Sequence, residues 1–479
     1  MKNRRPNILI ITADTLRHDA IGICNPIVRT PNIDGLAAGG AAFTRAYCAA
    51  PECAPSRAAM LTGLPPHRNG VYANCRITLD GTYHADQPYV LNSGIPTLAD
   101  MLAEHGYRDL LLPDTKYNCV VVDEKFRRFL KEHGFGNVHA PWGSDEAGLW
   151  YLPQPSPLPQ ELHLSHWTAD LVIRRLESWL QALPGPFLME FTFNKPHPPF
   201  DPPHPYDVMY NPTQVAPPIK GANYAPEQWP FYHLWQNSYK APWGQTPSFI
   251  GRMQRAAYYG SLSFVDAQVG RILEFLARHG LRDNTIVVVT GDHGCMLGDH
   301  YLYGKRSWYD GASRVPLIIS APDGLAGGRR NDDIVSHLDV LPTLLDLAGI
   351  PYKRASFPGM SLVDLVNKRA PARELLIGQY GEKEMAVYMC MDRRYKYVYA
   401  AADEYEMLFD HVNDPHESQN LALAPQNAAT QAHLREALIA YFRNQEYVDP
   451  IDGNDFRRFP LPPSYAATRR RCLATAQQG

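Results

Sequence analysis

Short apolar runs alternate along this chain with longer helical patterns, and this alternation constrains the fold most strongly. The strand candidates are residues 8–12, 187–193, 285–290 and 315–320. The helix candidates are residues 97–105, 256–279 and 338–348, and each is followed by a glycine of the kind that ends helices. Strands interleaved with helices predict an α/β fold with a large central, mostly parallel mixed sheet that is flanked by helices.

A second unit begins after about residue 370. Short β-like runs at 375–378, 385–390, 395–399 and 407–410 precede an amphipathic helix near 431–442. We therefore expect a large α/β domain over residues 1–370 and a small α+β subdomain of antiparallel sheet plus helix over residues 371–447. The tail, residues 448–479, has little core-forming pattern, and we interpret it as disordered or as an arm onto a neighbouring subunit.

Composition excludes several classes of function. Lys+Arg number 46 against 49 Asp+Glu, a formal charge of −3, so no basic field predicts nucleic-acid binding. No run reaches the roughly 18 apolar residues that a membrane helix needs, and the apolar stretch near the N-terminus is too short for a signal-peptide core. The eight cysteines lack metal-type CxxC spacing, and without an export signal we expect reduced thiols and a cytoplasmic protein.

Two of the predicted strands end in carboxylates. Asp14 follows the first strand, and Asp292 with His293 follows the strand at residues 285–290, between two glycines. Such residues can be ordinary caps or turn residues. The carboxyl ends of strands in an open α/β sheet are also where ligands bind. An Asp and a His that leave a strand together can hold one cation, with Asp14 as a third ligand.

A cysteine lies at a predicted helix start. In Cys53-Ala54-Pro55-Ser56-Arg57 the proline suits a first helical position, so Cys53 should lie near the helix N-terminus, where backbone amides favour an anion. Arg57 follows four residues later on the same face and offers a planar guanidinium to a tetrahedral oxyanion. Alternatively, Cys53 is an ordinary small buried residue.

Three more cationic or titratable residues follow strand ends. Lys195 and His197 lie in a proline-rich segment after the strand at 187–193, and the prolines would hold them in place. Lys305 lies farther along the chain from Asp292. The segment could be a rigid surface loop and each lysine could be solvated, so only co-location with the other candidates would make these residues functional.

These candidates occur within a series of segments that resembles the sulfatase family of the alkaline-phosphatase superfamily, in the family's order. The segments are residues 7–14, 30–34, 53–57, 61–63, 291–294, 297–300, 304–305, 314–318, 337–343 and 408–417. The Cys-x-Pro-Ser-Arg signature at 53–57 is highly specific, and the resemblance covers about residues 7–425. It implies an alkaline-phosphatase-like central sheet.

The resemblance also implies a mechanism. Cys53 would be converted to formylglycine by a maturation enzyme, and one hydroxyl of the hydrated aldehyde would attack sulfur or phosphorus. A divalent metal would lower the pKa of that hydroxyl. The metal ligands implied are Asp14, Asp292, His293 and the modified Cys53.

Further residues acquire roles from the same resemblance. Arg57, Lys195 and Lys305 would neutralise the substrate's oxygens and the charge that develops in the transition state. His197 would contact the substrate or protonate the leaving oxygen. Asn74 is an additional candidate donor to the oxyanion.

The chain departs from the family pattern at the metal site. Most sulfatases carry a second Asp after the first strand, where this chain has Thr15, and an Asn beside the later metal-binding Asp, where it has His293. The metal site would thus have one carboxylate ligand fewer and one nitrogen ligand in place of an oxygen ligand. This change moves the expected ion from Ca²⁺ alone toward Mn²⁺ or another transition ion. The family's Lys and His are also missing after Tyr107, and Asp114 or Thr115 could fill their space.

These departures are similar to the branch that contains phosphonate monoester hydrolases and choline sulfatases, as are segments 196–210 and 253–266. Some members of that branch assemble through C-terminal arms, so we expect a homo-oligomer, a dimer or a tetramer. Sulfate monoester hydrolysis is the first expectation, because the signature is that of a sulfatase. Phosphonate monoester or phosphodiester hydrolysis is the alternative.

The substrate should be a small-molecule ester whose alcohol part the sequence does not identify. We expect its pocket walls to come from residues 142–150 and 202–243. Aromatic side chains facing the metal would favour aryl esters, and carboxylates would favour a cationic alcohol such as choline.

Overall fold

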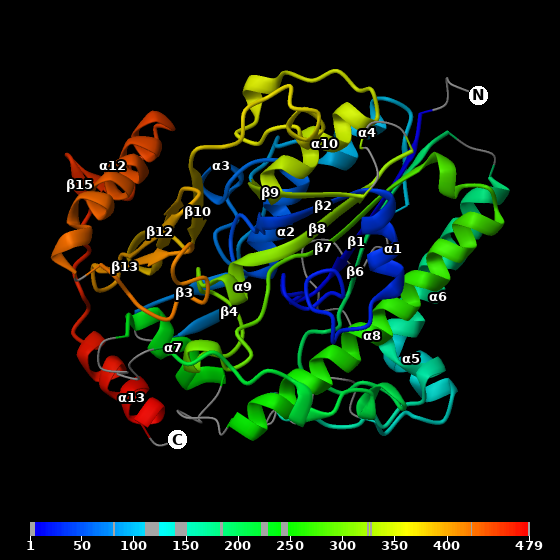
Figure 1. Ribbon diagram of the computed structural model, residues 1–479, viewed down its shortest axis with the longest axis horizontal. Helices are drawn as coiled ribbons and strands as arrows, with labels where there is room; N and C mark the ends of the chain where they lie inside the picture. Colours follow the sequence, from blue (N-terminus) through cyan, green and yellow to red (C-terminus); the bar gives the residue numbers. More distant parts are fainter. Residues whose placement is uncertain are drawn as a thin grey trace.

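The structure is a computed structural model that describes residues 5–79, 82–110, 124–138, 151–182, 185–221, 229–240, 248–322, 325, 328–422 and 424–477. Within them, seven strands form a central sheet in the order β5-β6-β1-β7-β8-β2-β9 (Figure 1). Their bounds are Arg108–Asp109, Phe187–Phe193, Asn7–Ala13, Thr285–Gly291, Arg314–Ser320, Ala41–Tyr47 and Arg329–Ser336. Among these strands β8 alone runs antiparallel to its neighbours, so the predicted α/β fold with a mostly parallel mixed sheet is confirmed.

Helices cover both faces of this sheet. Leu9 and Ile11 of β1 lie in one buried cluster with α1, α6 and α8, whereas Ile8 and Ile10 lie in another with α2, α4 and α10. The first set of helices comprises Pro31–Gly39, Leu164–Gln181 and Ser248–Arg278, and the second comprises Cys53–Thr62, Leu98–Ala103 and Val340–Leu347. The long helices α6 and α8 lie side by side on one flank (Figure 1).

Helix α8 begins eight residues before the helix predicted from residue 256. Its first two turns are held by polar contacts, which leave no apolar periodicity in the sequence. Tyr303 donates a hydrogen bond to Gln254 Oε1 at 2.9 Å, and Arg255 forms a buried ion pair with Asp299. A pattern search based on apolar residues therefore places the start of this helix too late.

The C-terminal subdomain is an antiparallel sheet in the order β10-β11-β12-β13, with α12 packed on it. The bounds are Leu376–Tyr380, Val387–Met391, Tyr395–Ala400, Tyr405–Asp410 and, for α12, Ala428–Asn444. This unit lies beside the central sheet rather than stacked on it (Figure 1). The predicted strand-and-helix pattern after residue 370 is thus present, with shifts of at most three residues at the element ends.

The tail is folded within the described residues. It contains the small hairpin of β14 and β15, which span Ile451–Asp452 and Asp455–Phe456, and helix α13, which spans Tyr465–Gln477. Helix α13 packs against α7, Phe231–Lys240, and buries Tyr465 and Cys472. Two apolar residues two turns apart form too weak a pattern to recognise, so the expectation of disorder is wrong. The role as an oligomerisation arm stays a prediction.

Smaller elements complete the described part of the chain. Strands β3 (Cys75–Ile77) and β4 (Tyr83–Pro88) form a hairpin. The short helices are α3 (Pro66–Asn69), α5 (Glu124–Glu132), α9 (Asp310–Ser313) and α11 (Leu362–Val366). None of the helices in the described ranges combines the length and the apolar character that crossing a bilayer requires.

Three neighbouring parallel strands end at one edge of the sheet, and this edge positions the site. Ala13 of β1 is in register with Phe193 of β6 on one side and with Gly291 of β7 on the other. The residues that follow these strands must therefore leave the sheet together.

Candidate active site

Asp14 and Asp292 are the first residues beyond the ends of β1 and β7, and both are fully buried. Arg57 joins them. Its Nη2 lies 3.2 Å from Asp14 Oδ2 and 2.9 Å from Asp292 Oδ2, and its Nε donates to Asp292 Oδ2 at 3.0 Å. Burial, and then the nearby Asp292 carboxylate, raise the pKa of Asp14 to about 7. Arg57, which was expected to face the substrate, contacts these two carboxylates here.

Cys53 is the first residue of α2, and its sulfur faces the same cluster. The Sγ atom lies 3.8 Å from Asp14 Oδ2 and 3.3 Å from His293 Nε2. The helix begins two residues before Pro55, which the sequence placed at the first helical position. A proline at the third position is equally compatible, because the first four N–H groups of a helix have no partner within it.

His293 presents its Nε2 to the cluster. Its Nδ1 lies 2.8 Å from the carbonyl oxygen of Gly294, which in the neutral ring keeps the proton on Nδ1 and leaves a lone pair on Nε2. Nε2 lies 3.8 Å from Asp14 Oδ1 and 3.6 Å from Asp292 Oδ1. The backbone carbonyl thus selects the tautomer that can bind a metal.

The four predicted ligands fit a divalent metal. One ligand atom from each of Asp14, Cys53, Asp292 and His293 lies within 4.8 Å of the others, and all four residues are buried. Among the described residues Asp14 Oδ1 has no hydrogen-bond donor, a costly state for a buried carboxylate oxygen unless a cation binds it. Carboxylate oxygen and imidazole nitrogen together suit a transition ion better than an all-oxygen site would.

Lys305 also contacts the nucleophile candidate. Its Nζ is 2.6 Å from Cys53 Sγ, and the residue is buried. Lys305 and Arg57 carry two formal positive charges, which balance the two carboxylates of Asp14 and Asp292. A divalent cation would therefore give the site a surplus of positive charge, which favours an anionic ester.

Lys195 and His197 follow β6 at the same edge of the sheet. Lys195 is buried and forms an ion pair with Asp201, and its Nζ also donates to the carbonyl oxygen of Pro199 at 2.6 Å. His197 Nδ1 lies 2.7 Å from the carbonyl oxygen of Pro198. The prolines hold both side chains, as expected, but the ammonium of Lys195 is engaged within its own loop.

Asn74 contacts the start of α2. The side-chain Oδ1 of Asn74 accepts a hydrogen bond from the backbone N–H of Ala54 at 2.8 Å. The backbone N–H of Asn74 donates to Glu52 Oε2 at 2.8 Å. Glu52, which the sequence analysis missed, is fully buried and also pairs with Arg306. Asn74 is thus fixed next to the nucleophile candidate, with its amide oxygen directed at the backbone.

Comparison with known proteins decides the family. The sulfatase family model matches residues 6–350, and the model of the C-terminal part of N-sulphoglucosamine sulphohydrolase matches residues 298–444. The chain belongs to the sulfatase family. It is a hydrolase of that family, as the Cys-x-Pro-Ser-Arg signature predicted.

Relatives whose names give different substrates resemble this chain to a similar degree. The arylsulfatase of Clostridium perfringens is 29% identical over 94% of this chain and 97% of its own length. The choline-sulfatase of Rhizobium meliloti is also 29% identical, over 96% and 91%. The phosphonate monoester hydrolase of Agrobacterium radiobacter has a TM-score of 0.75 at 26% identity, over 92% of this chain and 96% of its own.

Thr15, which replaces a carboxylate of most sulfatases, still contacts the site through its backbone. Its N–H donates to Asp292 Oδ1 at 3.1 Å, and its carbonyl accepts from the Tyr258 hydroxyl at 2.7 Å. The residue has a φ of 65°, an unfavourable value for a β-branched side chain. Local strain therefore orients a donor toward a metal-ligand carboxylate.

Ser56 and His337 form a second layer that sequence reasoning missed. The Ser56 hydroxyl donates to the backbone carbonyl of Asp292 and lies 3.0 Å from His337 Nδ1, while His337 Nε2 lies 3.2 Å from Thr290 Oγ1. Burial lowers the pKa of His337 to about 4, so the ring is neutral at pH 7. The available signal was that Ser56 and His337 lie in two of the segments that resemble the family, 53–57 and 337–343.

Some expectations concern residues outside the described ranges. Asp114, Thr115 and the segment 142–150 belong to these. The expected wall from 202–243 is partly described, and Tyr232 and Trp235 of α7 do line a pocket.

Proposed function

We propose that this sulfatase-family hydrolase cleaves sulfate monoesters with a formylglycine nucleophile derived from Cys53. The observation that supports this most is the position of Cys53 Sγ, which lies buried between His293 Nε2 and Lys305 Nζ at 3.3 and 2.6 Å. The thiol sulfur stands in for the hydroxyl oxygens of the hydrated aldehyde. One hydroxyl would attack the ester sulfur, and the other would then release sulfate as the aldehyde re-forms.

The surrounding residues supply charge and orientation. Asp14, Asp292 and His293 would hold a divalent metal, which lowers the pKa of the attacking hydroxyl. Lys305, in contact with the nucleophile, would neutralise the ester oxygens as charge develops on them. Arg57 holds both carboxylates in place, since it bonds to each.

The loop after β6 would act on the leaving group. His197 is the candidate that contacts the substrate or protonates the leaving oxygen, and its Nδ1 contact with Pro198 fixes the ring orientation. Lys195 would help to neutralise the substrate only if its ion pair with Asp201 opened, so we assign it first to holding the loop. Asn74 would act through the start of α2, which its side chain bonds.

The ion that we propose is Mn²⁺, with Ca²⁺ as the alternative. His293 supplies a nitrogen ligand and Thr15 supplies no carboxylate, and both features move the donor set away from the all-oxygen shell that Ca²⁺ prefers.

Phosphonate monoester or phosphodiester hydrolysis is the second candidate. The nitrogen ligand of His293 and the similarity to two phosphonate monoester hydrolases, with TM-scores of 0.75 and 0.76, favour it. We also propose that the chain works in the cytoplasm as a dimer or tetramer and that a maturation enzyme modifies Cys53.

One assay separates the two activities. We expect kcat/KM of the purified, metal-loaded enzyme to be higher on an aryl sulfate than on a phenylphosphonate monoester or a phosphate diester with the same leaving group. A phosphonate value more than about a hundredfold above the sulfate value, about 2.7 kcal/mol of transition-state preference, would make the sulfatase assignment wrong.

Mass spectrometry tests the nucleophile. The peptide that contains Cys53 should carry the aldehyde mass when the chain is produced together with a formylglycine-generating enzyme. Finding only the thiol under those conditions would exclude the proposed modification.

A further inference from the structure

Two segments of the chain meet beside the nucleophile candidate, and three successive contacts join them. The backbone N–H of Arg306 donates to the carbonyl oxygen of Pro51 at 2.8 Å. The guanidinium of Arg306 forms an ion pair with Glu52. The Nζ of Lys305 lies 2.6 Å from Cys53 Sγ. The segment 51–53, at the start of α2, is therefore tied residue by residue to the segment 305–306 between β7 and α9.

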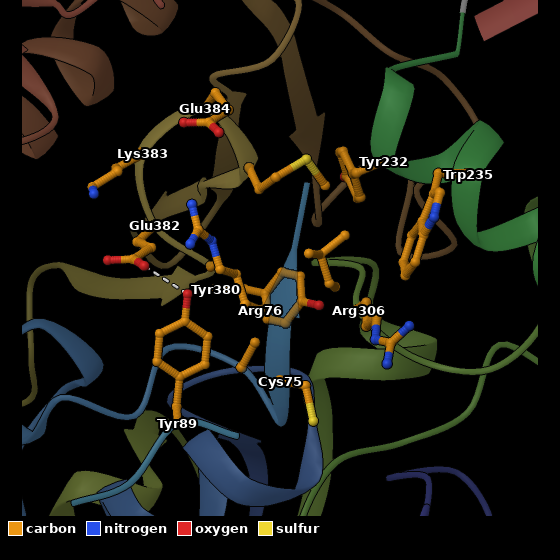
Figure 2. Close-up of a pocket in the computed structure, with 14 residues that line it drawn as sticks. Cys75, Arg76, Tyr89, Tyr232, Trp235, Arg306, Tyr380, Glu382, Lys383 and Glu384 are labelled. Carbon is orange, nitrogen blue, oxygen red and sulfur yellow. Dashed lines mark hydrogen bonds between the residues drawn. The ribbon is translucent and has the colours of Figure 1, made fainter. Parts of the chain in front are cut away.

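The ion pair within this junction is buried. Glu52 is fully buried and Arg306 is 5% exposed. The second carboxylate oxygen of Glu52 accepts the backbone N–H of Asn74 at 2.8 Å. Arg306 borders the pocket shown in Figure 2, and its guanidinium lies 5.1 Å from the ring centroid of Trp235. A charge-assisted hydrogen bond in such desolvated surroundings holds both of its partners firmly.

The segment 304–306 has a backbone that requires support from outside. Gly304 has a φ of 76° and Arg306 has a φ of 70°. The left-handed region suits glycine, but it is disfavoured for a residue with a Cβ atom, so contacts must hold Arg306 there. The carbonyl oxygen of Gly304 accepts from the backbone N–H of Met296 at 2.7 Å. With Arg306 bound to Pro51 and Glu52, both neighbours of Lys305 are fixed.

We propose that Glu52 and Arg306 are positioning residues whose ion pair holds the Lys305 ammonium at the nucleophile, where it meets the oxygens of the anionic ester. The inference rests on the proposed sulfate ester hydrolysis and assigns two further residues a part in it. A lysine side chain has a long, flexible stem, so its ammonium is in place before the substrate binds only if the backbone beneath it is fixed. Charge stabilises a transition state most effectively when it is preorganised in this way.

A merely structural ion pair would behave differently. Neutral residues of similar volume often replace a buried ion pair without loss of stability. If the pair only stabilised the fold, its loss would lower the amount of active enzyme by the same factor whether or not Lys305 were present. If the pair acts through Lys305, its loss matters only when Lys305 is there. The dependence on Lys305 therefore separates the two roles.

The test is a double-mutant cycle of wild type, Glu52→Gln, Lys305→Met and the double variant. The kcat on 4-nitrophenyl sulfate is measured for metal-loaded enzyme and divided by the formylglycine content found by mass spectrometry. We expect Glu52→Gln to lower kcat about tenfold to a hundredfold, because a misplacement of about 1 Å can cost that much. In the Lys305→Met background the same change should cost less than about twofold. An equal factor in both backgrounds, or an unchanged kcat in Glu52→Gln, overturns the proposal.

A neutral pair protects the test against misfolding. Glu52→Gln alone leaves the buried guanidinium of Arg306 without its anion, so Glu52→Gln/Arg306→Met is carried through the same cycle. It should show the same dependence on Lys305. If this neutral pair also fails to fold, the ion pair is structural and the positioning role is wrong.

The affinity for inorganic sulfate gives a readout that needs no turnover. Isothermal titration calorimetry of the metal-loaded chains should show that Glu52→Gln weakens sulfate binding where Lys305 is present and leaves it unchanged in the Lys305→Met background. Equal weakening in both backgrounds contradicts the proposal. If the wild type binds sulfate but hydrolyses no sulfate ester, the proposed function fails, and the binding cycle still decides whether Glu52 and Arg306 position Lys305.

The matched control is Glu417→Gln. Glu417 is also a buried glutamate, and it pairs with the buried ammonium of Lys396 in the C-terminal subdomain. The folded Glu417→Gln variant should keep the wild-type kcat. A loss of kcat as large as that of Glu52→Gln would mean that any broken buried ion pair lowers turnover, and it would overturn the assignment.

Discussion

At the scale of single residues, the position of Cys53 carries the functional argument. An ordinary buried cysteine packs against apolar side chains, whereas the sulfur of Cys53 contacts Lys305 and His293. We predict that Cys53→Ala abolishes sulfate ester turnover and leaves the fold intact. The change removes one buried sulfur atom, so the far-UV circular dichroism spectrum should match that of the wild type.

The control for that variant is another buried cysteine. Cys390→Ala removes an equally buried thiol from the C-terminal sheet and should keep wild-type turnover. Loss of the dichroism signal in Cys53→Ala alone would show that Cys53 has a structural role, and residual turnover would show that it is not the nucleophile.

At the scale of elements, strand ends were the most informative part of the sequence. The sequences of β1, β6 and β7 are short, mostly apolar runs, which predict buried strands. The register of these strands brings the residues that follow them together. The edge strand β9 was missed because its sequence begins with two arginines and contains two aspartates. Helix α6 was missed although Leu164, Val172 and Leu176 repeat at helical spacing.

The partners within the site could not be predicted in the same way. Arg57 was expected to bind substrate, yet it bridges Asp14 and Asp292, because the sequence does not show which side chains share a buried volume. Glu52 and Arg306 carry no motif of their own, and they meet only when β3, α2 and the loop after β7 are assembled. Long-range polar pairing of this kind has no periodicity to read.

An ion pair network joins the two domains. Lys396 of β12 is fully buried, and its Nζ donates to Asp310 Oδ1 at 2.6 Å and to Glu417 Oε1 at 2.7 Å. Asp310, His411 and Glu417 lie close enough to hold a metal, but this ammonium already supplies the cation. The network therefore stabilises the domain contact rather than forming a second metal centre.

Removing the lysine tests that interpretation. Lys396→Met removes the cation that the two buried carboxylates share and leaves Asp310 with Arg314 and Glu417 with His411. We predict a loss of about 3 kcal/mol of unfolding free energy. Denaturant titration measures it. The exposed Lys353→Met is the control and should change stability by less than about 0.5 kcal/mol. Equal stability of the two variants would contradict the assigned role.

At the scale of the whole molecule, the same network should make stability depend on pH. Burial opposes ionisation of Asp310 and Glu417, but Lys396 and His411, with Arg314 at Asp310, together outweigh it and hold the pKa of both below their ordinary values of 3.8 and 4.5. The unfolded chain therefore binds these protons more readily than the folded one. The resulting stability is fully present above about pH 5 and is lost as the pH falls below those ordinary values.

Unfolding free energies measured at pH 7, 5, 4 and 3 check this dependence. The wild type should lose stability more steeply between pH 5 and 3 than Lys396→Met, in which the carboxylates have lost the strongest of the charges that lower their pKa values. The comparison removes the contribution of all other carboxylates, because both chains share them. Parallel curves for the two chains would contradict the prediction.

The C-terminal tail links overall assembly to the pocket. Helix α13 packs on α7 in the cluster that contains Phe231, Leu234 and Trp235, and Trp235 also lines a pocket beside β3 (Figure 2). Arg469 of α13 further donates to the carbonyl oxygen of Trp229 at 3.0 Å. Loss of α13 should therefore expose apolar surface on α7 and loosen one wall of the pocket.

We predict that a chain ending at Phe459 loses about 2 kcal/mol or more of stability, since a large apolar side chain contributes about 1.5–3 kcal/mol when buried. A chain ending at Ala474 keeps Tyr465 and Cys472 and serves as the control. Thermal melting and light scattering distinguish the two roles of the tail. A smaller assembly with an unchanged melting temperature would mean that the segment acts as an oligomerisation arm alone, and that α7 does not depend on it.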